Sequence, residues 1–467
     1  TWTTNGTVNF VKIDLSLDSG STFPNSITTS TSNTGIYAWT VPDSVSGTLR
    51  VRVSQTTDAE AFDASDGNFR IRAVFTLSSP NGAEQWRVSQ SQNIAWSVVG
   101  TIPNVKLQYS LDVFNASVLT ITASTPNTSP YAWTIPDSIS NTVRVRVSGP
   151  NDIGALDDSN ADFRITGDFT VTAPNGGEQW TVGSAQNITW TKTGSVSNAK
   201  IELSTNSGGT WSTIAGLVTN SGTYAWTVPD SITAAARVRV SDPADATAND
   251  ISNTDFKIKS LFTVVAPNGG EIWTVGESRQ LNWTNTGTVP LVKIEYSTNG
   301  GAAYQPISES YQTLNDGIVL NSAPYTWPVQ DAISTQVRIR VSSSTDSTDA
   351  FDASDANFKI RGSLTLTFPN GGESLDIASS QFISWMVIGS IANVKLLYST
   401  DAGVTYPNVI IASAPANPTA YSWMIPDVPT TTARVRVEDA TDATVFDTSN
   451  ANFSIVGNFT ITAPNGG

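Results

Sequence analysis

Short runs of alternating apolar and polar residues follow one another along the whole chain. Between residues 169 and 260, turn residues separate six such runs, which occupy 169–173, 188–190, 199–203, 224–228, 236–240 and 255–259. A period of two residues is typical of β-strands that turn one face to a core and the other to water. No stretch spaces its apolar residues as a helix would over three turns. The pattern therefore predicts strands throughout and almost no helix.

The pattern returns at a long interval. A Tyr-X-Trp motif occurs five times at spacings of 94, 93, 101 and 96 residues, with its tyrosine at Tyr37, Tyr131, Tyr224, Tyr325 and Tyr421. This period is longer than that of solenoid units, which repeat about every 20–50 residues. Each copy therefore has the length of a whole domain. About seven short strands per copy suit a two-sheet sandwich with tryptophans between the sheets. The sequence therefore predicts an all-β fold, a tandem array of immunoglobulin-like or fibronectin-III-like β-sandwiches.

The five predicted repeats have almost no chain between them. Their ranges are 1–74, 75–168, 169–260, 261–362 and 363–457, and residues 458–467 would form the first strand of a further repeat or a donor strand. No Gly/Ser-rich or Pro-rich tether separates the repeats. We therefore expect neighbouring repeats to touch and to form a stiff array.

The first repeat lacks its first strands, because residues 1–3 match residues 189–191 from the middle of the third repeat. Two interpretations stay open at this stage. The sequence is a window from a longer repetitive chain, or residues 459–467 of one subunit complete the first sandwich of the next.

Composition removes several classes of function. Lys and Arg number 25 against 40 Asp and Glu, and the resulting formal charge of −15 repels nucleic acids and anionic lipid surfaces. The chain has no Cys and no His, which leaves carboxylate, hydroxyl and amide chemistry. No run of about 18 apolar residues occurs that would span a membrane. The abundance of Thr, Ser, Asn and Gly, with only 14% charged residues, favours an extracellular or cell-surface location.

One sequence resemblance adds to this picture. Residues 169–190 read FTVTAPNGGEQWTVGSAQNITW and are followed by KIELS, GTYAWTVPDSI, ARVRVSD and SNTDFKI. This set resembles the immunoglobulin-like domain at the N-terminus of fungal cell-wall Ser/Thr-rich GPI-anchored proteins, and similar repeats in bacterial surface proteins. The resemblance extends over every repeat, although Ala83 and Leu375 depart from it. It implies a wall-associated or secreted structural module and supplies no catalytic residue.

Acidic residues gather in the loop before the last strand of every repeat. Clustered carboxylates near a junction between domains suit calcium, which takes about six to eight oxygen ligands. The candidate ligands are Asp58, Asp63 and Asp66 in repeat 1 and Asp346, Asp349, Asp352 and Asp355 in repeat 4. The alternatives are Asx turns that keep the loop soluble and, as a third reading, the acid and base of a glycosidase. Calcium is the one cofactor that the sequence suggests.

Two basic positions also recur on predicted strands. An arginine pair, as at Arg237 and Arg239, alternates with apolar residues and therefore lies on one sheet face. It would bind acidic loops of a neighbouring chain, or form a solvated face that discourages wrong sheet pairing. A recurring lysine, such as Lys293, and the Asn357 before the last strand of the same repeat suggest a Lys–Asn crosslink as a further alternative.

These features together favour a non-enzymatic extracellular structural protein, a subunit or segment of a fibre, filament or surface stalk that associates with itself. The alternative is a cell-surface adhesin or carbohydrate-binding array. Such a protein would use aromatic residues of the variable stretch, namely Trp211, Tyr304 and Tyr406, and surface glycans would be its partners.

Overall fold

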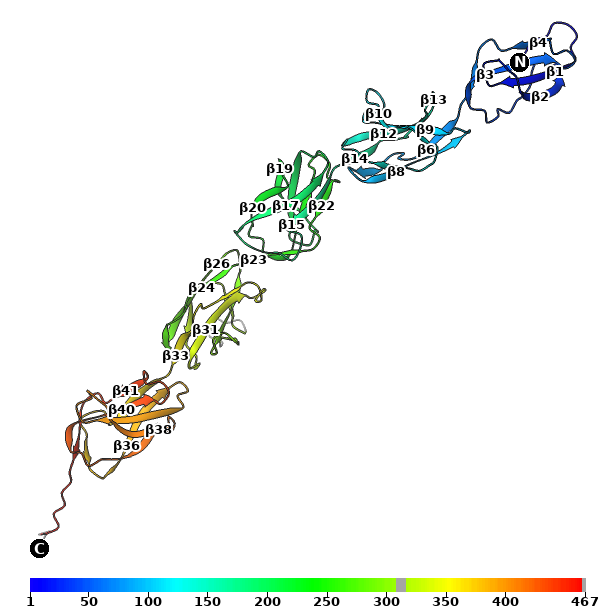
Figure 1. Ribbon diagram of the computed structural model, residues 1–467. Coiled ribbons are helices and arrows are strands. Elements are labelled where there is room, and N and C mark those ends of the chain that lie inside the picture. The colour runs from blue at the N-terminus through cyan, green and yellow to red at the C-terminus, as the bar shows by residue number, and fades with distance from the viewer. Residues whose placement is uncertain (308–315, 464–467) are drawn as a thin grey trace. The chain divides into compact units, whose positions relative to one another are not determined.

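The computed structural model describes residues 1–307 and 316–463. Every regular element within these residues is a β-strand, and none of them belongs to a helix long and apolar enough to cross a membrane. The predicted all-β fold of tandem sandwiches is confirmed (Figure 1). Backbone contacts divide the chain into two compact units, and the division passes through repeat 3.

The first unit comprises Thr1–Gly177, Asn187–Ala225 and Ala235–Phe256. Its repeat 1 has the strands β1 (Phe10–Ser16), β2 (Asn25–Ser32), β3 (Ser46–Gln55), β4 (Phe62–Ala64) and β5 (Phe69–Ile71). Its repeat 2 has the strands β6 (Val74–Ser79), β7 (Gln85–Arg87), β8 (Ser91–Val99), β9 (Asn104–Ser110), β10 (Leu119–Pro126), β11 (Tyr131–Thr134), β12 (Ser140–Gly149), β13 (Asp152–Asp158) and β14 (Phe163–Thr166).

Repeat 3 has the same succession of strands, and they fall partly in each unit. They are β15 (Asp168–Ala173), β16 (Gln179–Thr181), β17 (Ala185–Thr193), β18 (Asn198–Ser204), β19 (Ser212–Thr219), β20 (Thr223–Thr227), β21 (Thr233–Ser241), β22 (Asn249–Ile251) and β23 (Phe256–Lys259).

The second unit comprises Glu178–Gln186, Trp226–Ala234 and Lys257–Gly467. Its repeat 4 has the strands β24 (Phe262–Ala266), β25 (Ile272–Thr274), β26 (Ser278–Asn285), β27 (Leu291–Ser297), β28 (Gln305–Pro306), β29 (Ile318–Leu320), β30 (Tyr325–Pro328), β31 (Ser334–Ser343), β32 (Phe351–Ala353) and β33 (Phe358–Arg361). Its repeat 5 has the strands β34 (Ser363–Phe368), β35 (Ser374–Asp376), β36 (Ser380–Ile388), β37 (Asn393–Ser399), β38 (Asn408–Pro415), β39 (Ala420–Met424), β40 (Thr430–Asp439), β41 (Phe446–Thr448) and β42 (Phe453–Val456).

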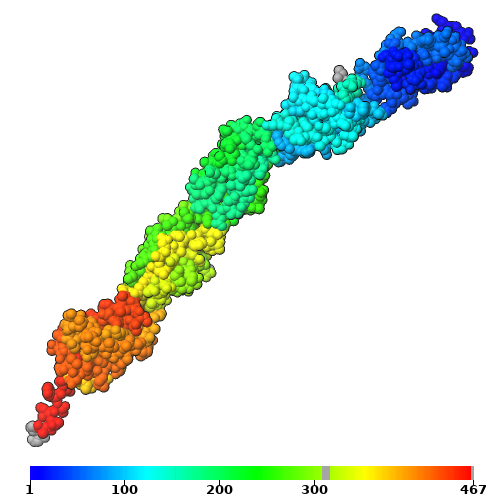
Figure 2. All heavy atoms as spheres, in the orientation of Figure 1, coloured from blue at the N-terminus to red at the C-terminus, as the bar shows by residue number. Residues whose placement is uncertain are grey.

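A small sheet and a large sheet make up each complete sandwich. In repeat 5 the small sheet has the order β34-β36-β39, and the large sheet has the order β35-β42-β40-β37-β38 with β41 beside β40. Repeats 2 and 4 have the corresponding orders. The short strand after the first turn pairs parallel to the last strand, as β35 does with β42, so the chain changes sheets at that turn. Figure 2 shows the closely packed side chains of each repeat.

Alternation places the core between the two sheets. Along β12, Val143, Val145 and Val147 are fully buried, whereas the arginines between them face outward. The tryptophans fill the space between the sheets, as predicted: Trp86 and Trp133 pack with ring centroids 6.0 Å apart. In repeat 5 the buried Leu375 takes the place of the first tryptophan.

Candidate functional site: the junctions between repeats

The turn that follows each of the first four Tyr-X-Trp motifs carries an aspartate, and this aspartate contacts the next repeat. In the first unit, Asp43 accepts hydrogen bonds from the backbone amide of Thr101 at 2.6 Å and from its hydroxyl at 2.5 Å. Asp137 accepts the same two bonds from Ser195, at 2.9 and 2.5 Å. Both donors lie in the loop that joins the small sheet to the large sheet of the following repeat.

The second unit has the same contact twice. Asp230 accepts from the amide of Thr288 at 3.0 Å and from its hydroxyl at 2.6 Å. Asp331 accepts from the amide of Ser390 at 3.0 Å and also from its hydroxyl. We call this contact of one aspartate with an amide and a hydroxyl the junction clasp.

A glycine precedes the hydroxyl residue of every clasp. Gly194 and Gly287 have φ values of +87° and +75°, a conformation that favours glycine. A Cβ atom on Gly287 would lie 2.9 Å from Oδ1 of Asp230, and one on Gly194 would lie 3.3 Å from Oδ1 of Asp137. Glycine is therefore required both for the turn and for the close approach of the aspartate.

Hydrogen bonding favours the ionised form of the clasp aspartates. The hydroxyl of Thr101, and then its amide, lower the pKa of Asp43 from its ordinary value. The pKa values of Asp137 and Asp230 are lowered in the same way by Ser195 and Thr288. A charged carboxylate is a stronger acceptor than a neutral one. Asp43, Asp137 and Asp230 therefore form their clasps as carboxylates at neutral pH.

A second contact occurs at the same four junctions. A basic residue in the last strand of one repeat, or directly after it, reaches the acidic loop of the next, within one unit in each case. The nitrogen–oxygen distances are 3.3 Å for Arg72–Asp152, 4.0 Å for Arg164–Asp245 and 3.3 Å for Lys257–Asp346, and Lys359 contacts Asp442. Partly exposed ion pairs of this kind contribute only about 0.2–1 kcal/mol each. Their regular placement matters more for orientation than for strength.

In the structure the predicted calcium ligands of repeat 4 contact protein groups. Asp346 and Asp349 both contact Lys257 of the preceding repeat, and Asp355 accepts a hydrogen bond from the side chain of Asn268 at 2.8 Å. Within residues 1–307 and 316–463, no three acidic side chains gather as metal ligands would. A calcium site in these loops stays a prediction.

The predicted ligands of repeat 1 fit the alternative of a turn. Asp58 accepts a hydrogen bond from the amide of Glu60 at 3.0 Å, which is an Asx turn, and Asp63 accepts one from the amide of Ala64 at 2.9 Å. Asp66 is exposed in the loop before β5.

An Asp-X-Ser motif at the short strand before the last strand joins the two sheets of each complete repeat. In repeat 4, Asp352 accepts from the first-strand amide of Val264 at 2.7 Å, and Ser354 donates to the carbonyl of Pro267 at 2.7 Å. The same aspartate contact occurs as Asp157–Leu77, Asp250–Val171 and Asp447–Leu366. Sequence reasoning took these aspartates as calcium ligands or loop residues and missed this role. The constant spacing of Asp and Ser was the available signal.

The recurring basic positions have intramolecular partners. In repeat 4, Arg340 and Lys293 both contact the buried carboxylate of Glu295, at 2.5 and 2.8 Å, and Arg338 donates to Asn357 at 2.8 Å. The same arrangement occurs in repeats 1, 3 and 5. The lysine contacts a carboxylate, and the Asn or Asp before the last strand accepts a hydrogen bond from an arginine. The lysines and the Asn or Asp residues thus bind separate partners in the folded chain, and a Lys–Asn or Lys–Asp crosslink stays a prediction.

The aromatic residues proposed for glycan binding cover the second arginine of each pair. The arginine carbon Cζ lies 4.5 Å from the ring centroid of Trp211, 4.3 Å from that of Tyr304 and 6.0 Å from that of Tyr406. All three rings are half-buried. Each ring thus uses one face in a cation–π contact, which shields the ion pair beneath it.

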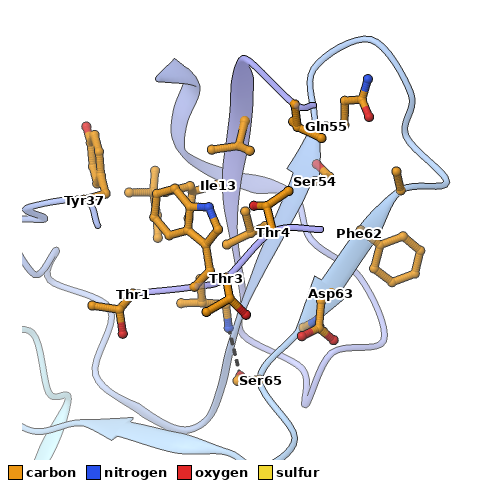
Figure 3. A pocket seen from close by; sticks show the side chains of 18 of the residues that line it. Thr1, Thr3, Thr4, Ile13, Tyr37, Ser54, Gln55, Phe62, Asp63 and Ser65 are labelled. Carbon is orange, nitrogen blue, oxygen red and sulfur yellow. Dashed lines mark hydrogen bonds between the residues drawn. The ribbon is translucent and has the colours of Figure 1, made fainter. Parts of the chain in front are cut away.

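Repeat 1 has a hollow of about 880 Å³ on the inner face of its sheet (Figure 3). Ile13, Trp39 and Val51 line it, and Asp63 and Ser65 lie at its side. In repeats 2, 4 and 5 a three-stranded sheet covers the corresponding face. The described residues that line the hollow offer no second carboxylate to pair with Asp63, so the hollow has no acid–base pair for hydrolysis.

The donor-strand interpretation concerns the other end of the sequence. Residues 458–463 form no strand, and Phe459 and Ile461 are 94% and 69% exposed. Residues 464–467 lie outside the described part of the chain. Completion of a first sandwich by this segment stays a prediction.

The fold and its junctions define a tandem array of immunoglobulin-like β-sandwiches. No known protein family matches the chain. No curated protein matches it either. The resemblance to fungal wall proteins and bacterial surface repeats therefore stays a prediction.

Solved structures of tandem sandwich domains are similar to the chain at low identity. The four N-terminal Ig domains of Dscam1 isoform 8.4 share 11% identity over 83% of this chain and 99% of that one, with a TM-score of 0.24. Sidekick-1 immunoglobulin domains 1–4 share 10% identity over 83% and 99%, with a TM-score of 0.22. The fibronectin(III)-like modules of Clostridium thermocellum CbhA share 18% identity over 42% and 95%, with a TM-score of 0.17. At these scores the likeness says nothing of function.

Proposed function

We propose that the chain is a non-enzymatic extracellular structural protein, a subunit or segment of a fibre, filament or surface stalk in which the repeats act as coupled spacers. The observation that supports this proposal is the recurrence of one contact set at all four junctions. Each junction has a clasp, and each has a basic residue against the acidic loop of the next repeat.

The two contacts restrain a junction better together than either would alone. The clasp fixes the turn after the Tyr-X-Trp motif against one loop of the next repeat. The ion pair fixes the end of the last strand against another loop. Two attachments at separate places oppose bending about the short connecting chain, whereas one would leave a hinge. An array that must transmit position or force along its length needs this restraint, and an enzyme does not.

The proposal is tested by electron microscopy of the native material and of a variant with weakened junctions. We expect the native protein to form extended assemblies whose axial repeat is a multiple of one domain. The variant Asp43→Ala/Asp137→Ala/Asp230→Ala/Asp331→Ala should bend at the junctions while each repeat stays folded. The matched control is Asp376→Ala, an exposed carboxylate at the end of β35. Native particles that bend as freely as the variant would contradict the proposal.

The adhesin alternative predicts binding of surface glycans through exposed aromatic rings. The contacts of Trp211, Tyr304 and Tyr406 with arginines leave only one face of each ring for a sugar. A glycan array decides between the two. Specific binding that Trp211→Ala abolishes, with junctions unaffected, would move the adhesin to first place.

A further inference from the structure

The outer face of the small sheet in repeat 5 is apolar. Phe382, Met386 and Ile388 of β36 are 62%, 57% and 52% exposed, and Met424 of β39 is 63% exposed. They face outward because alternation turns the intervening residues, such as the fully buried Ile383, toward the core. The chain has two methionines, and both lie on this face.

The same face of repeats 3 and 4 is largely polar. Alignment on the core tryptophan of the strand gives the equivalents in repeat 3 as Asn187, Thr191, Thr193 and Thr227. In repeat 4, β26 has Gln280 and Thr284 at two of these positions. The fold does not require apolar residues here, since neighbouring copies of the same fold form without them. The apolar face therefore needs a different explanation.

The face has a pattern of large and small residues that suits packing against itself. Met424 lies opposite Ser380 in the pairing of β36 with β39, and Phe382 lies opposite Ser422. On the other side of β36, Met386 lies opposite Thr365. Each large side chain is thus next to a small one. Two such faces can interdigitate, with the large residues of one copy over the small residues of the other.

Charge also favours a second copy as the partner. The chain carries a formal charge of −15, yet every outward residue of β36 and β39 is uncharged, as Ser380, Ser384 and Ala420 illustrate. Two copies can meet at this face without bringing carboxylates together. A partner chosen for opposite charge would find no charge to bind.

The available area is close to what a specific contact needs. Four large side chains of about 200 Å² each, a little over half exposed, give about 450 Å² of apolar area per copy. With the serine, threonine and alanine side chains between them, two faces would bury about 1,000 Å² or more, which is near the lower limit for a specific interface.

We propose that this face, made of the outward residues of β36 and β39, is a contact by which two copies of the chain associate face to face. The inference stands on repeat 5 alone and does not depend on the fibre proposal. It differs from association through arginine faces, because no ion pair is involved.

The first test is sedimentation of the full chain over a concentration series. We expect reversible dimers, strengthened by added salt because salt screens the repulsion between acidic chains. The variant Phe382→Asn/Met386→Thr/Ile388→Thr/Met424→Thr, which installs the residues of repeat 3, should dimerise about 100-fold more weakly or not at all. The control Leu217→Thr/Val404→Thr removes apolar side chains that are 68% and 81% exposed elsewhere, and it should dimerise normally.

A second test does not depend on the stability of the multiple variant. Because the chain has no cysteine, a single Ser384→Cys substitution places one thiol at the centre of the face. Mild oxidation should then link two copies rapidly. The matched Thr189→Cys, at the equivalent position of repeat 3, should link them at the slow rate of random collision. Equal rates for the two variants, or a chain that stays monomeric at all concentrations, would overturn the proposal.

Discussion

Replacing Asn220 by alanine should weaken repeat 3 through the loss of two buried hydrogen bonds. The side chain of Asn220 is 4% exposed, and it accepts from the indole nitrogen of Trp190 at 2.7 Å. It also donates to the carbonyl of Val196 at 2.9 Å. The side chain of alanine can make neither bond, and Trp190 is itself only 3% exposed.

The structure sets the size of the effect. A buried polar group without a partner costs about 1–3 kcal/mol. The carbonyl of Val196 keeps one partner, because Lys192 donates to it at 3.2 Å, so the main cost falls on the indole of Trp190. We therefore expect a loss of about 2–3 kcal/mol in the free energy of unfolding of repeat 3.

Repeat 5 provides a natural bound on this estimate. Ala416 stands there in place of the asparagine, and the indole nitrogen of Trp385 donates to its backbone carbonyl at 3.1 Å. If Trp190 shifts to the carbonyl of residue 220 in the same way, the loss falls to about 1 kcal/mol. A loss below that value would mean that the buried asparagine is not needed to satisfy the tryptophan.

Hydrogen exchange with mass spectrometry measures the effect in the intact chain, because peptides from different repeats report separately. The expected loss of about 2–3 kcal/mol corresponds to exchange about 30–150-fold faster in the core strands of repeat 3, because each tenfold is about 1.4 kcal/mol. The bound of about 1 kcal/mol corresponds to about fivefold faster exchange. Repeats 1 and 5 should be unchanged. The reasoning is refuted if exchange in repeat 3 changes less than about threefold, or if every repeat loosens equally. Asn321→Ala in repeat 4, where the same bond to Trp283 is 2.8 Å long, is a parallel case.

Three further predictions concern the junctions. Asp137→Ala should expose the Ser195 amide and speed its hydrogen exchange about tenfold. Asp137→Asn keeps one acceptor oxygen and should have a smaller effect. Equal effects of the two substitutions would contradict the role of that acceptor. The pKa values of Asp43, Asp137 and Asp230 are lowered from 3.8 in the folded chain, so the clasps should be intact above that pH and be lost as the pH falls through the lowered values. Amide exchange of Thr101, Ser195 and Thr288 followed from pH 6 downward checks this, and loosening already near pH 5 would refute it. Calcium binding to Asp346 and Asp349 would have to displace Lys257, so Lys257→Gln should bind calcium more tightly than the native chain in a titration calorimeter, and equal or absent binding would end the calcium hypothesis.

The fold was predictable because its signals are local. Alternation identifies strands such as β12 and β21 one at a time, and the Tyr-X-Trp period indicates a tandem arrangement without any knowledge of contacts. The core positions follow from the same alternation. The order of strands within the sheets is not local, and a sequence pattern for one strand does not say which strand lies beside it.

The roles of the charged residues were less predictable for a related reason. A carboxylate such as Asp352 looks the same in sequence whether it binds a metal, caps a turn or accepts a distant amide. Its partner, the amide of Val264, lies 88 residues away and has no side-chain signature. The clasps leave a clearer signal in the sequence. The aspartate and the Gly-Thr or Gly-Ser pair recur at a separation of 58 or 59 residues. Recognising them requires comparing the copies with one another and not with other proteins.

The distribution of shared and divergent residues bears on how such an array works. Every residue of a clasp belongs to a motif present in each repeat, so any copy can follow any other without a new interface. The longest repeat supports this point. The interval between Tyr224 and Tyr325 is 101 residues, and in the sequence the additional residues fall between β28 and β29, outside the motifs that form the clasps. Length can therefore be added by duplication while the junctions stay the same.

The outward sheet faces are free of this constraint, because they contact neither the core nor a junction. The apolar face on β36 and β39 is where repeat 5 departs from repeats 3 and 4 without disturbing its fold. Specific association is thus best sought on such faces, and extension at the junctions.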